Sequence, residues 1–320
     1  SAGYDFFRIA SGDIRRNDRV VLIRAGIHGD ETAGPLTIIR YFNRIFDYAH
    51  KRGIKLIVYP LGNPAGYDAR QRYDADPGEG SPANNDFVLY ELKNGKFVDD
   101  IGRSAGFKRW YWSSDRRLNH ELPAETALMH ELLKRDPLES IVAFLDLHQD
   151  MISPVDRAAA YHYGFGDLMV YDRIVEAILK IVPVLSNKVI RAGQSSGMRT
   201  NSQGFIVRHD GTLGDLMHRL GVKYAVTPET TGKTPPDQAL RVNWTWIKGL
   251  VDLAAKKTGT VKRPYPKEVA APLKQNAAGH RMIKAGRIRT DTGVHPIYAA
   301  LTGDYRSDLP RIVLSAGIHG

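Results

Sequence analysis

Apolar segments with the spacing of strands and of helices alternate along most of this chain, and this alternation limits the folds that it can adopt. Residues 20–23 form a continuous apolar run typical of a buried strand. Apolar residues at helical spacing follow as far as Gly53, and residues 54–61 are the next apolar run. Strands that alternate with helices predict an α/β fold in which a mainly parallel, twisted sheet is flanked by helices.

The same alternation returns in the second half of the chain. We expect helices at 124–135, 168–182 and 236–255, and strands at 141–147 and 222–228. Residues 74–117 interrupt the pattern, because they are rich in Asp, Gly, Pro, Asn and aromatic residues without clear periodicity. They predict a long surface excursion. Its aromatic cluster at 110–112 could line a pocket or pin the loop to the domain.

The composition changes after residue 255. Residues 256–286 are basic and contain prolines, which is typical of a linker. Beyond them, residues 295–320 align without gaps with residues 4–29 and share the run Ala-Gly-Ile-His-Gly. We therefore predict a domain at 1–255, a linker at 256–286 and a partial repeat of the N-terminal hairpin at 287–320. A second, unrelated hairpin of similar sequence is the alternative. Such an extension favours self-association through exposed strands.

The net charge of +10 is concentrated in this extension. From residue 256 onward there are 12 Lys and Arg against 4 Asp and Glu, whereas the remaining residues hold 33 against 31. This distribution favours a solvated basic linker over a nucleic-acid-binding surface, with contact to RNA, acidic lipid or an acidic partner as the alternatives. No apolar run approaches the roughly 20 residues of a membrane span. A chain without cysteine fits a cytoplasmic location, and a secreted protein with a trimmed signal peptide is the other possibility.

Candidate metal ligands follow two of the predicted strands. His28 and Glu31 come after the first apolar run, and His148 ends the strand that begins at residue 141. Without cysteine, zinc requires His, Asp or Glu ligands, and a catalytic zinc site has three protein ligands and one open position. A lone histidine at a strand end is usually structural, but here the His-x-x-Glu pair favours a zinc site formed by these three residues.

A candidate general base follows the strand predicted at 222–228. Glu229 lies at the end of this strand, where a carboxylate could take the proton of a water on the metal and pass it to a leaving amine. The histidines at 162, 209 and 218 have no ligand-like spacing, so we expect them to be surface residues or to have ordinary partners.

Several short motifs, in a consistent order over roughly residues 15–255, resemble those of the zinc carboxypeptidase family, and in particular its succinylglutamate desuccinylase and aspartoacylase branch. They are His-Gly-Asp-Glu at 28–31, Gly-Asn-Pro at 62–64, Arg72-Tyr73, Leu118-Asn119, the strand ending in His148, and Gly211-Thr212 with Asp215 ahead of Glu229. The resemblance implies a mixed α/β sheet flanked by helices. It also implies one zinc on His28, Glu31 and His148, Glu229 as general base, and Arg72 as the residue that stabilises the oxyanion.

The substrate-binding segment departs from the family. Where the family has Asp-Leu-Asn-Arg, this chain has Arg117-Leu118-Asn119-His120, so Asn119 and His120 are the candidate substrate-binding residues. A histidine cannot form the two-point contact that a guanidinium makes with a carboxylate. We expect a zinc-dependent hydrolase of amide bonds, acting as a metallocarboxypeptidase on a peptide or peptide-like substrate. A deacylase of small N-acyl amino acids and a non-catalytic binding protein on the same fold are the alternatives.

Overall fold

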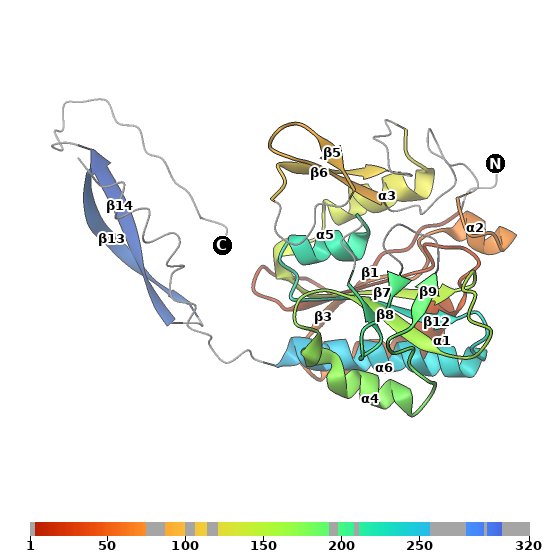
Figure 1. Ribbon diagram of the computed structural model, residues 1–320. Coiled ribbons are helices and arrows are strands. Elements are labelled where there is room, and N and C mark those ends of the chain that lie inside the picture. Colours follow the sequence, from red (N-terminus) through yellow and green to blue (C-terminus); the bar gives the residue numbers. More distant parts are fainter. Residues whose placement is uncertain are drawn as a thin grey trace. The chain divides into compact units, whose positions relative to one another are not determined.

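The computed structural model describes residues 4–74, 87–99, 106–113, 121–191, 198–207, 211–256, 280–290 and 293–302 (Figure 1). The chain divides into two compact units, Ser1–Lys256 and Lys257–Gly320. Each unit is described by itself.

The first unit is built on a seven-stranded sheet with the strand order β1-β3-β2-β7-β12-β8-β11 (Figure 1). Its strands are β1 (Ile9–Ala10), β2 (Val20–Ala25), β3 (Lys55–Tyr59), β7 (Ile141–Asp150), β8 (Ala160–Gly164), β11 (Phe205–Ile206) and β12 (Tyr224–Thr231). The four strands β3, β2, β7 and β12 are parallel. At the edges, β1 pairs antiparallel with β3, and β8 pairs antiparallel with β12 but parallel with β11. The prediction of a mixed, mainly parallel sheet is therefore confirmed.

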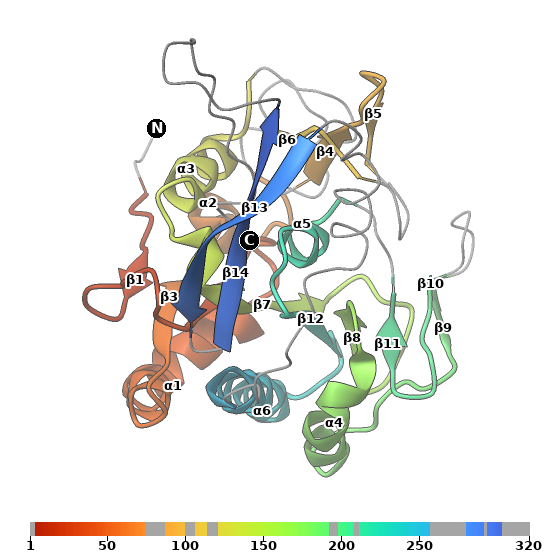
Figure 2. The ribbon, with the colours of Figure 1, turned by 90° about the vertical axis from the view of Figure 1, so that its left-hand side faces the viewer.

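Helices cover both faces of the sheet (Figures 1 and 2). On one face lie α1 (Ala33–His50), α4 (Asp172–Leu179) and α6 (Pro236–Ala255), and on the other lie α3 (Ala124–Leu133) and α5 (Leu213–Arg219). A hydrophobic core lies on each face of the sheet, and alternate residues of β2 point into one or the other. Val21 and Ile23 pack with α1 and α6, while Val20 and Leu22 pack with α3 and α5. This alternation follows from the two-residue repeat of a strand and explains why β2 is apolar throughout its first four residues.

The predicted strands and helices are present with boundaries that differ by a few residues. The helix expected from residue 168 begins with a 3-10 turn, Leu168–Tyr171, before α4. The short elements β1, β8, β11 and α5 were not predicted, nor were α2 (Pro64–Ala69), β9 (Val189–Arg191) and β10 (Met198–Arg199). These segments are short, and most span too few residues to display a period.

The excursion predicted at 74–117 contains more structure than expected. Its described residues form an antiparallel sheet of β4 (Phe87–Glu91), β5 (Phe97–Val98) and β6 (Arg109–Ser113). Val88, Tyr90 and Trp112 are buried in the core shared with α3 and α5, so an irregular surface loop was the wrong prediction for this part. Trp110 and Trp112 both contact the His130 ring of α3, which supports the alternative that the aromatic cluster pins the excursion.

The described part of the second unit is an antiparallel hairpin of β13 (His280–Thr290) and β14 (Gly293–Thr302), with a register shift between Lys284 and Gly286. β13 begins inside the segment predicted as a linker at 256–286. Most of the predicted repeat lies outside the described residues. The assignment of a linker and a partial repeat therefore stays a prediction.

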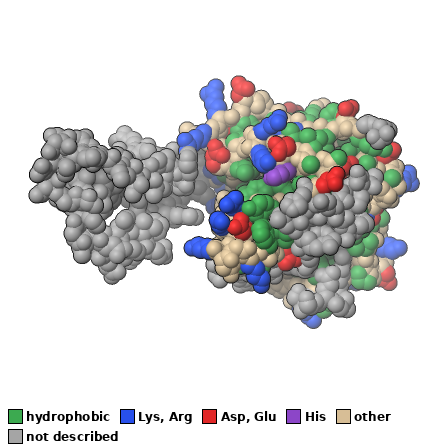
Figure 3. Space-filling model, turned by 90° about the horizontal axis from the view of Figure 1, so that it is seen from above, with side chains coloured by type: hydrophobic (Ala, Val, Ile, Leu, Met, Phe, Trp, Pro, Cys, Tyr) green, Lys and Arg blue, Asp and Glu red, His purple; other side chains and the backbone are tan. Residues whose placement is uncertain are grey.

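Charged side chains of both signs are interspersed on the face of the molecule seen in Figure 3. This agrees with the nearly balanced charge that the sequence gives to residues 1–255. Among the described residues, no helix has the length and apolar character needed to cross a membrane.

Candidate metal centre and active site

The candidate site lies where the order of strands reverses. The chain runs from β2 through α1 to β3 on one side of β2, whereas β7 pairs with the other side. The carboxyl ends of two such parallel strands border a crevice, which is the usual ligand site of an open α/β sheet. His28 and Glu31 follow β2, and His148 lies near the end of β7.

The loop after β2 is fixed by close contact with α2. Gly29 N donates a hydrogen bond to Arg72 O at 3.1 Å. A Cβ atom at Gly29 would lie 2.0 Å from the carbonyl carbon of Gly66, so this position needs glycine. Gly66 N in turn donates to the side chain of Asn63, which caps α2, at 2.7 Å. The motifs at 28–31 and 62–64 thus form one packed unit that presents His28 and Glu31.

The structure brings the three predicted ligands together. His28 Nδ1 lies 2.8 Å from Glu31 Oε1, and His148 Nδ1 lies 2.9 Å from Glu31 Oε2. One ligand atom from each of the three residues lies within 4.8 Å of the others, and all three residues are buried. Two imidazole nitrogens and one carboxylate oxygen match the ligand chemistry of a zinc site with an open position.

The electrostatics of this group favour an ionised carboxylate. Burial alone would raise the pKa of Glu31, but the charges of His28 and His148 bring it well below its usual range. Burial lowers the pKa of His148, whereas the neighbouring carboxylates of Asp146 and Glu31 raise it more strongly, to well above its usual range. Gln149 N also donates to Glu31 Oε2 at 3.0 Å. The Glu31 carboxylate is therefore anionic, as a metal ligand would need to be.

Two charged residues beside the ligands were not found from the sequence. Asp146 Oδ2 lies 3.1 Å from His148 Nε2, and Asp146 also accepts hydrogen bonds from Arg24. Both residues lie on buried strands, where an ionised side chain has to be paired. The available signal was the occurrence of Arg and Asp within the apolar runs of β2 and β7.

Glu229 lies beside the candidate ligands. It pairs with His148 across the parallel strands β12 and β7, and its Oε1 is 4.0 Å from His148 Nδ1. Within the described part of the chain, its Oε2 is buried and has no hydrogen-bond partner. Burial raises the pKa of Glu229 well above its usual range, which outweighs the lowering by His148, and Glu31 and Asp150 raise it further. The same burial makes its carboxylate a stronger base than an exposed glutamate.

Arg72 also reaches the site. Its Nη1 donates to Glu31 Oε1 at 2.6 Å and lies 4.0 Å from Asp30 Oδ1. The guanidinium is mostly buried, with a side-chain exposure of 15%. Arg72 therefore supplies a fixed positive charge at the edge of the candidate metal centre.

Tyr161 lies next to Glu229 on the neighbouring strand of the sheet. It pairs with Glu229 across β8 and β12, and its hydroxyl donates to Asp150 Oδ2 at 2.6 Å. The phenol is buried, and burial together with Glu229 raises its pKa well above its usual range. The hydroxyl is thus a neutral group that helps to hold Asp150.

The remaining candidates divide into two groups. Asn119 and His120 lie outside the described residues. His162 is described, and the expectation for it was wrong: it is fully buried, and neither ring nitrogen has a hydrogen-bond partner within the described part of the chain. It packs against the rings of Phe205 and Trp246.

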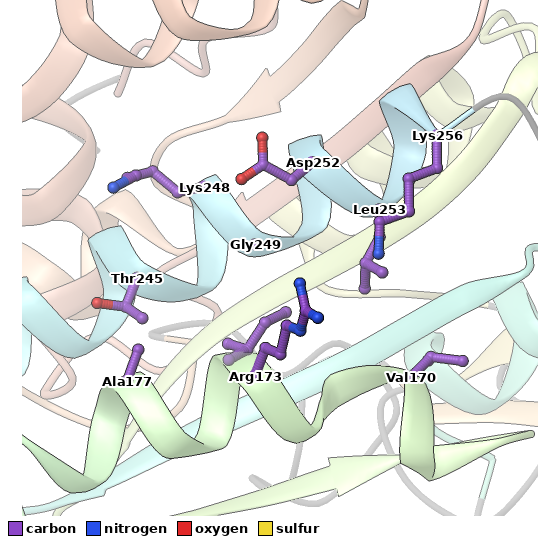
Figure 4. A pocket seen from close by; sticks show the side chains of 10 residues that line it. Val170, Arg173, Ala177, Thr245, Lys248, Gly249, Asp252, Leu253 and Lys256 are labelled. Carbon is purple, nitrogen blue, oxygen red and sulfur yellow. The ribbon is translucent and has the colours of Figure 1, made fainter.

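A separate groove of about 480 Å³ lies between α4 and α6 (Figure 4). The Arg173 side chain extends from α4 toward α6. Ile174 and Leu253 are among the apolar residues that line the groove. None of the candidate active-site residues lines this groove.

A family model matches residues 17–164, and its description is the succinylglutamate desuccinylase/aspartoacylase catalytic domain. The match covers His28, Glu31, Arg72 and His148 but ends before Glu229. No curated protein matches the sequence.

Solved structures share the fold at low sequence identity. A candidate metallopeptidase from Shewanella amazonensis SB2B is 20% identical with a TM-score of 0.54, covering 78% of this chain and 82% of that chain. Another, from Shewanella baltica OS155, is 17% identical with a TM-score of 0.57, covering 79% and 83%. The thrombin activatable fibrinolysis inhibitor is 15% identical with a TM-score of 0.50, covering 79% and 65%. These likenesses concern the fold, and with the family match they confirm the resemblance predicted from the sequence motifs.

Proposed function

We propose that this protein of the zinc carboxypeptidase type, in the succinylglutamate desuccinylase/aspartoacylase branch, is a zinc-dependent hydrolase that cleaves an amide bond. The observation that carries the proposal is the convergence of His28, Glu31 and His148 beside Glu229. Two of the proposed ligands lie in the loop after β2 and the third lies on the neighbouring strand β7, while Glu229 lies on β12.

The donor set fits zinc. In the described structure the two Nδ1 atoms both face the carboxylate of Glu31, at 2.8 Å and 2.9 Å. A zinc ion held by these residues would supply Lewis-acid chemistry to a carbonyl oxygen and would make water more acidic. The unpartnered Oε2 of Glu229 supports the same assignment, because a buried carboxylate oxygen is normally hydrogen-bonded, here to water or substrate.

Glu229 is assigned as the general base. A carboxylate at this position could take a proton from water and release it to the departing amine, and a pKa raised by burial makes that carboxylate a stronger base. Its pairing with His148 on rigid strands fixes where the proton is taken.

We assign to Arg72 the role of stabilising the negative charge that develops on the carbonyl oxygen of the cleaved bond. Its guanidinium is always charged and already lies 2.6 Å from a candidate ligand, Glu31. A preorganised cation of this kind lowers the energy of the transition state more than that of the ground state.

We propose a peptide or peptide-like substrate that is cleaved at its carboxyl end, with Asn119 and His120 binding the substrate. A small N-acyl amino acid is the second candidate, and the description of the matching family favours it. Both reactions break an amide bond, so the same roles of Glu229 and Arg72 serve either one.

The test is hydrolysis by the full chain before and after metal removal. Two substrate panels are compared: N-blocked dipeptides with a free carboxylate, and N-acyl amino acids such as N-succinylglutamate. We expect chelation to abolish turnover of one panel and zinc to restore it. Turnover that persists without zinc, or no hydrolysis of either panel by the zinc-loaded protein, would contradict the proposal.

The ligand assignment is tested separately from activity. His148→Ala should lose tightly bound zinc, as measured by metal analysis after gel filtration. His50→Ala removes an exposed histidine at the end of α1 and should retain one equivalent. Full retention of zinc by His148→Ala would remove His148 from the ligand set.

A further inference from the structure

We infer that Arg24 is a positioning residue for the zinc ligand His148 and that it acts through Asp146. This inference rests on the proposed zinc site. It assigns a role to a buried arginine that lies four residues before the His-Gly-Asp-Glu motif and is not part of it.

Arg24 holds both oxygens of Asp146. Its Nε donates to Asp146 Oδ1 at 3.0 Å, and its Nη2 donates to Asp146 Oδ2. A two-point contact between a guanidinium and a carboxylate fixes the plane of the carboxylate as well as its position. Neighbouring strands carry the two residues, and Arg24 and Asp146 are paired residues of β2 and β7.

Asp146 then fixes the ring of His148. Asp146 Oδ2 lies 3.1 Å from His148 Nε2, so Oδ2 is shared between Arg24 and the histidine. A proton on Nε2 that is donated to Asp146 leaves the lone pair of Nδ1 free, and Nδ1 is the atom that lies 2.9 Å from Glu31. A histidine that binds a metal commonly has such a partner on its other nitrogen, and that partner sets the ring orientation.

The burial of the pair argues for a role beyond stability. The side-chain exposures of Arg24 and Asp146 are 1% and 4%, so both charges are removed from water. A buried ion pair is often no more stabilising than an apolar pair of the same size, because removing two charges from water costs free energy. Every other residue of β2 is apolar, and an apolar pair would suit the core equally well.

The Arg24 guanidinium binds Asp146 at two points. Arg24 is therefore connected to the reaction through Asp146 and His148.

The test measures zinc affinity and does not use activity. The metal-free full chain is titrated with zinc against a competing chelator for the wild type, Arg24→Met, Asp146→Asn and the double variant. We expect Arg24→Met to raise the zinc Kd about tenfold or more, within the range known for residues that support a metal ligand. The double variant should bind no more weakly than Asp146→Asn alone, because Arg24 acts through Asp146.

Arg8→Met is the matched control. Arg8 Nε donates to Asp136 Oδ1 at 2.7 Å, in an ion pair that does not include a candidate ligand. This variant should lower the free energy of unfolding and leave the zinc Kd unchanged. If Arg24→Met does not fold, Arg24→Lys keeps the charge without the two-point contact and should raise the zinc Kd at least threefold.

An unchanged zinc Kd in folded Arg24→Met or in Arg24→Lys would overturn this inference and leave the proposed function intact. The inference would also be overturned if Arg24→Met raised the zinc Kd by the same factor in the wild type and in the Asp146→Asn variant. A wild-type chain that binds no zinc would overturn both the inference and the proposed function.

Discussion

His148 and Glu229 are paired residues of the adjacent parallel strands β7 and β12, and His148 Nδ1 lies 4.0 Å from Glu229 Oε1. The hydrogen bonds of the sheet therefore set the separation between a candidate metal ligand and the candidate base. Residues that work together are held more rigidly by strands than by loops. The proposal that Glu229 takes a proton from water beside the metal depends on this pairing.

Replacement of the base is the first prediction. Glu229→Gln preserves the shape of the side chain but cannot accept a proton, so kcat should fall about 10²- to 10⁴-fold. Zinc content and the unfolding midpoint should stay within error of the wild type. Glu176→Gln, which changes an exposed glutamate on α4, is the control and should leave kcat unchanged. Near-normal turnover in Glu229→Gln would assign the base to another residue.

Acid sensitivity of the fold is the second prediction. Burial lowers the pKa of His162 to about 3, whereas an unfolded histidine titrates at about 6.5. Between these values the unfolded chain binds a proton that the folded chain does not. The contribution of His162 to stability is thus fully present above pH 6.5 and is lost as the pH falls toward 3. Between pH 6.5 and pH 5 the loss is about 2 kcal/mol.

The measurement is the free energy of unfolding by urea at pH 7, 6 and 5. His162→Phe keeps an aromatic ring beside Phe205 and Trp246. It should reduce the slope of the unfolding free energy against pH by up to about 1.4 kcal/mol per pH unit. His50→Gln, at an exposed position, should keep the wild-type slope. An equal slope in His162→Phe and the wild type would show that His162 does not set the acid sensitivity.

Binding of the substrate carboxylate is the third prediction, and it comes from the sequence alone. His120→Arg would replace a titrating donor by a fixed, two-point one, so KM for a carboxylate-bearing substrate should fall about tenfold. The comparison uses one substrate with a free carboxylate and its amide, for which KM should not change. If KM stays constant for both, either the alignment of residues 117–120 with the family motif is wrong or another cation already binds the carboxylate.

Removal of the second unit is the fourth prediction. A chain that ends at Lys256 keeps all of the first unit, whereas a cut at residue 286 would divide β13. The shortened chain should retain zinc and activity. If the second unit mediates self-association, the shortened chain should sediment as a smaller oligomer than the full chain. Loss of metal binding would show that the second unit is an integral part of the hydrolase domain.

The fold and the convergence of the three candidate ligands could be predicted because their signals are local. Apolar runs mark the strands, and His28, Glu31 and His148 follow or end such runs. The carboxyl ends of parallel strands meet at one edge, so strand order alone brings these residues near one another. Glu229 was found by the same argument.

What could not be predicted depends on register and on packing between distant segments. Nothing in the sequence pairs Arg24 with Asp146, because that requires β2 and β7 to be aligned residue by residue. The burial of His162 follows from α6 bringing Trp246 over β8. The sheet of β4, β5 and β6 has strands of two to five residues, which are too short for a clear period.

The most direct test of the central claim is an anomalous difference map from crystals of the zinc-loaded chain, recorded on both sides of the zinc absorption edge. The account predicts one strong peak bonded to His28 Nδ1, a carboxylate oxygen of Glu31 and His148 Nδ1, with Glu229 near it but not bonded. No peak at these residues, or a peak held by other side chains, would contradict the proposed metal centre and the hydrolytic function built on it.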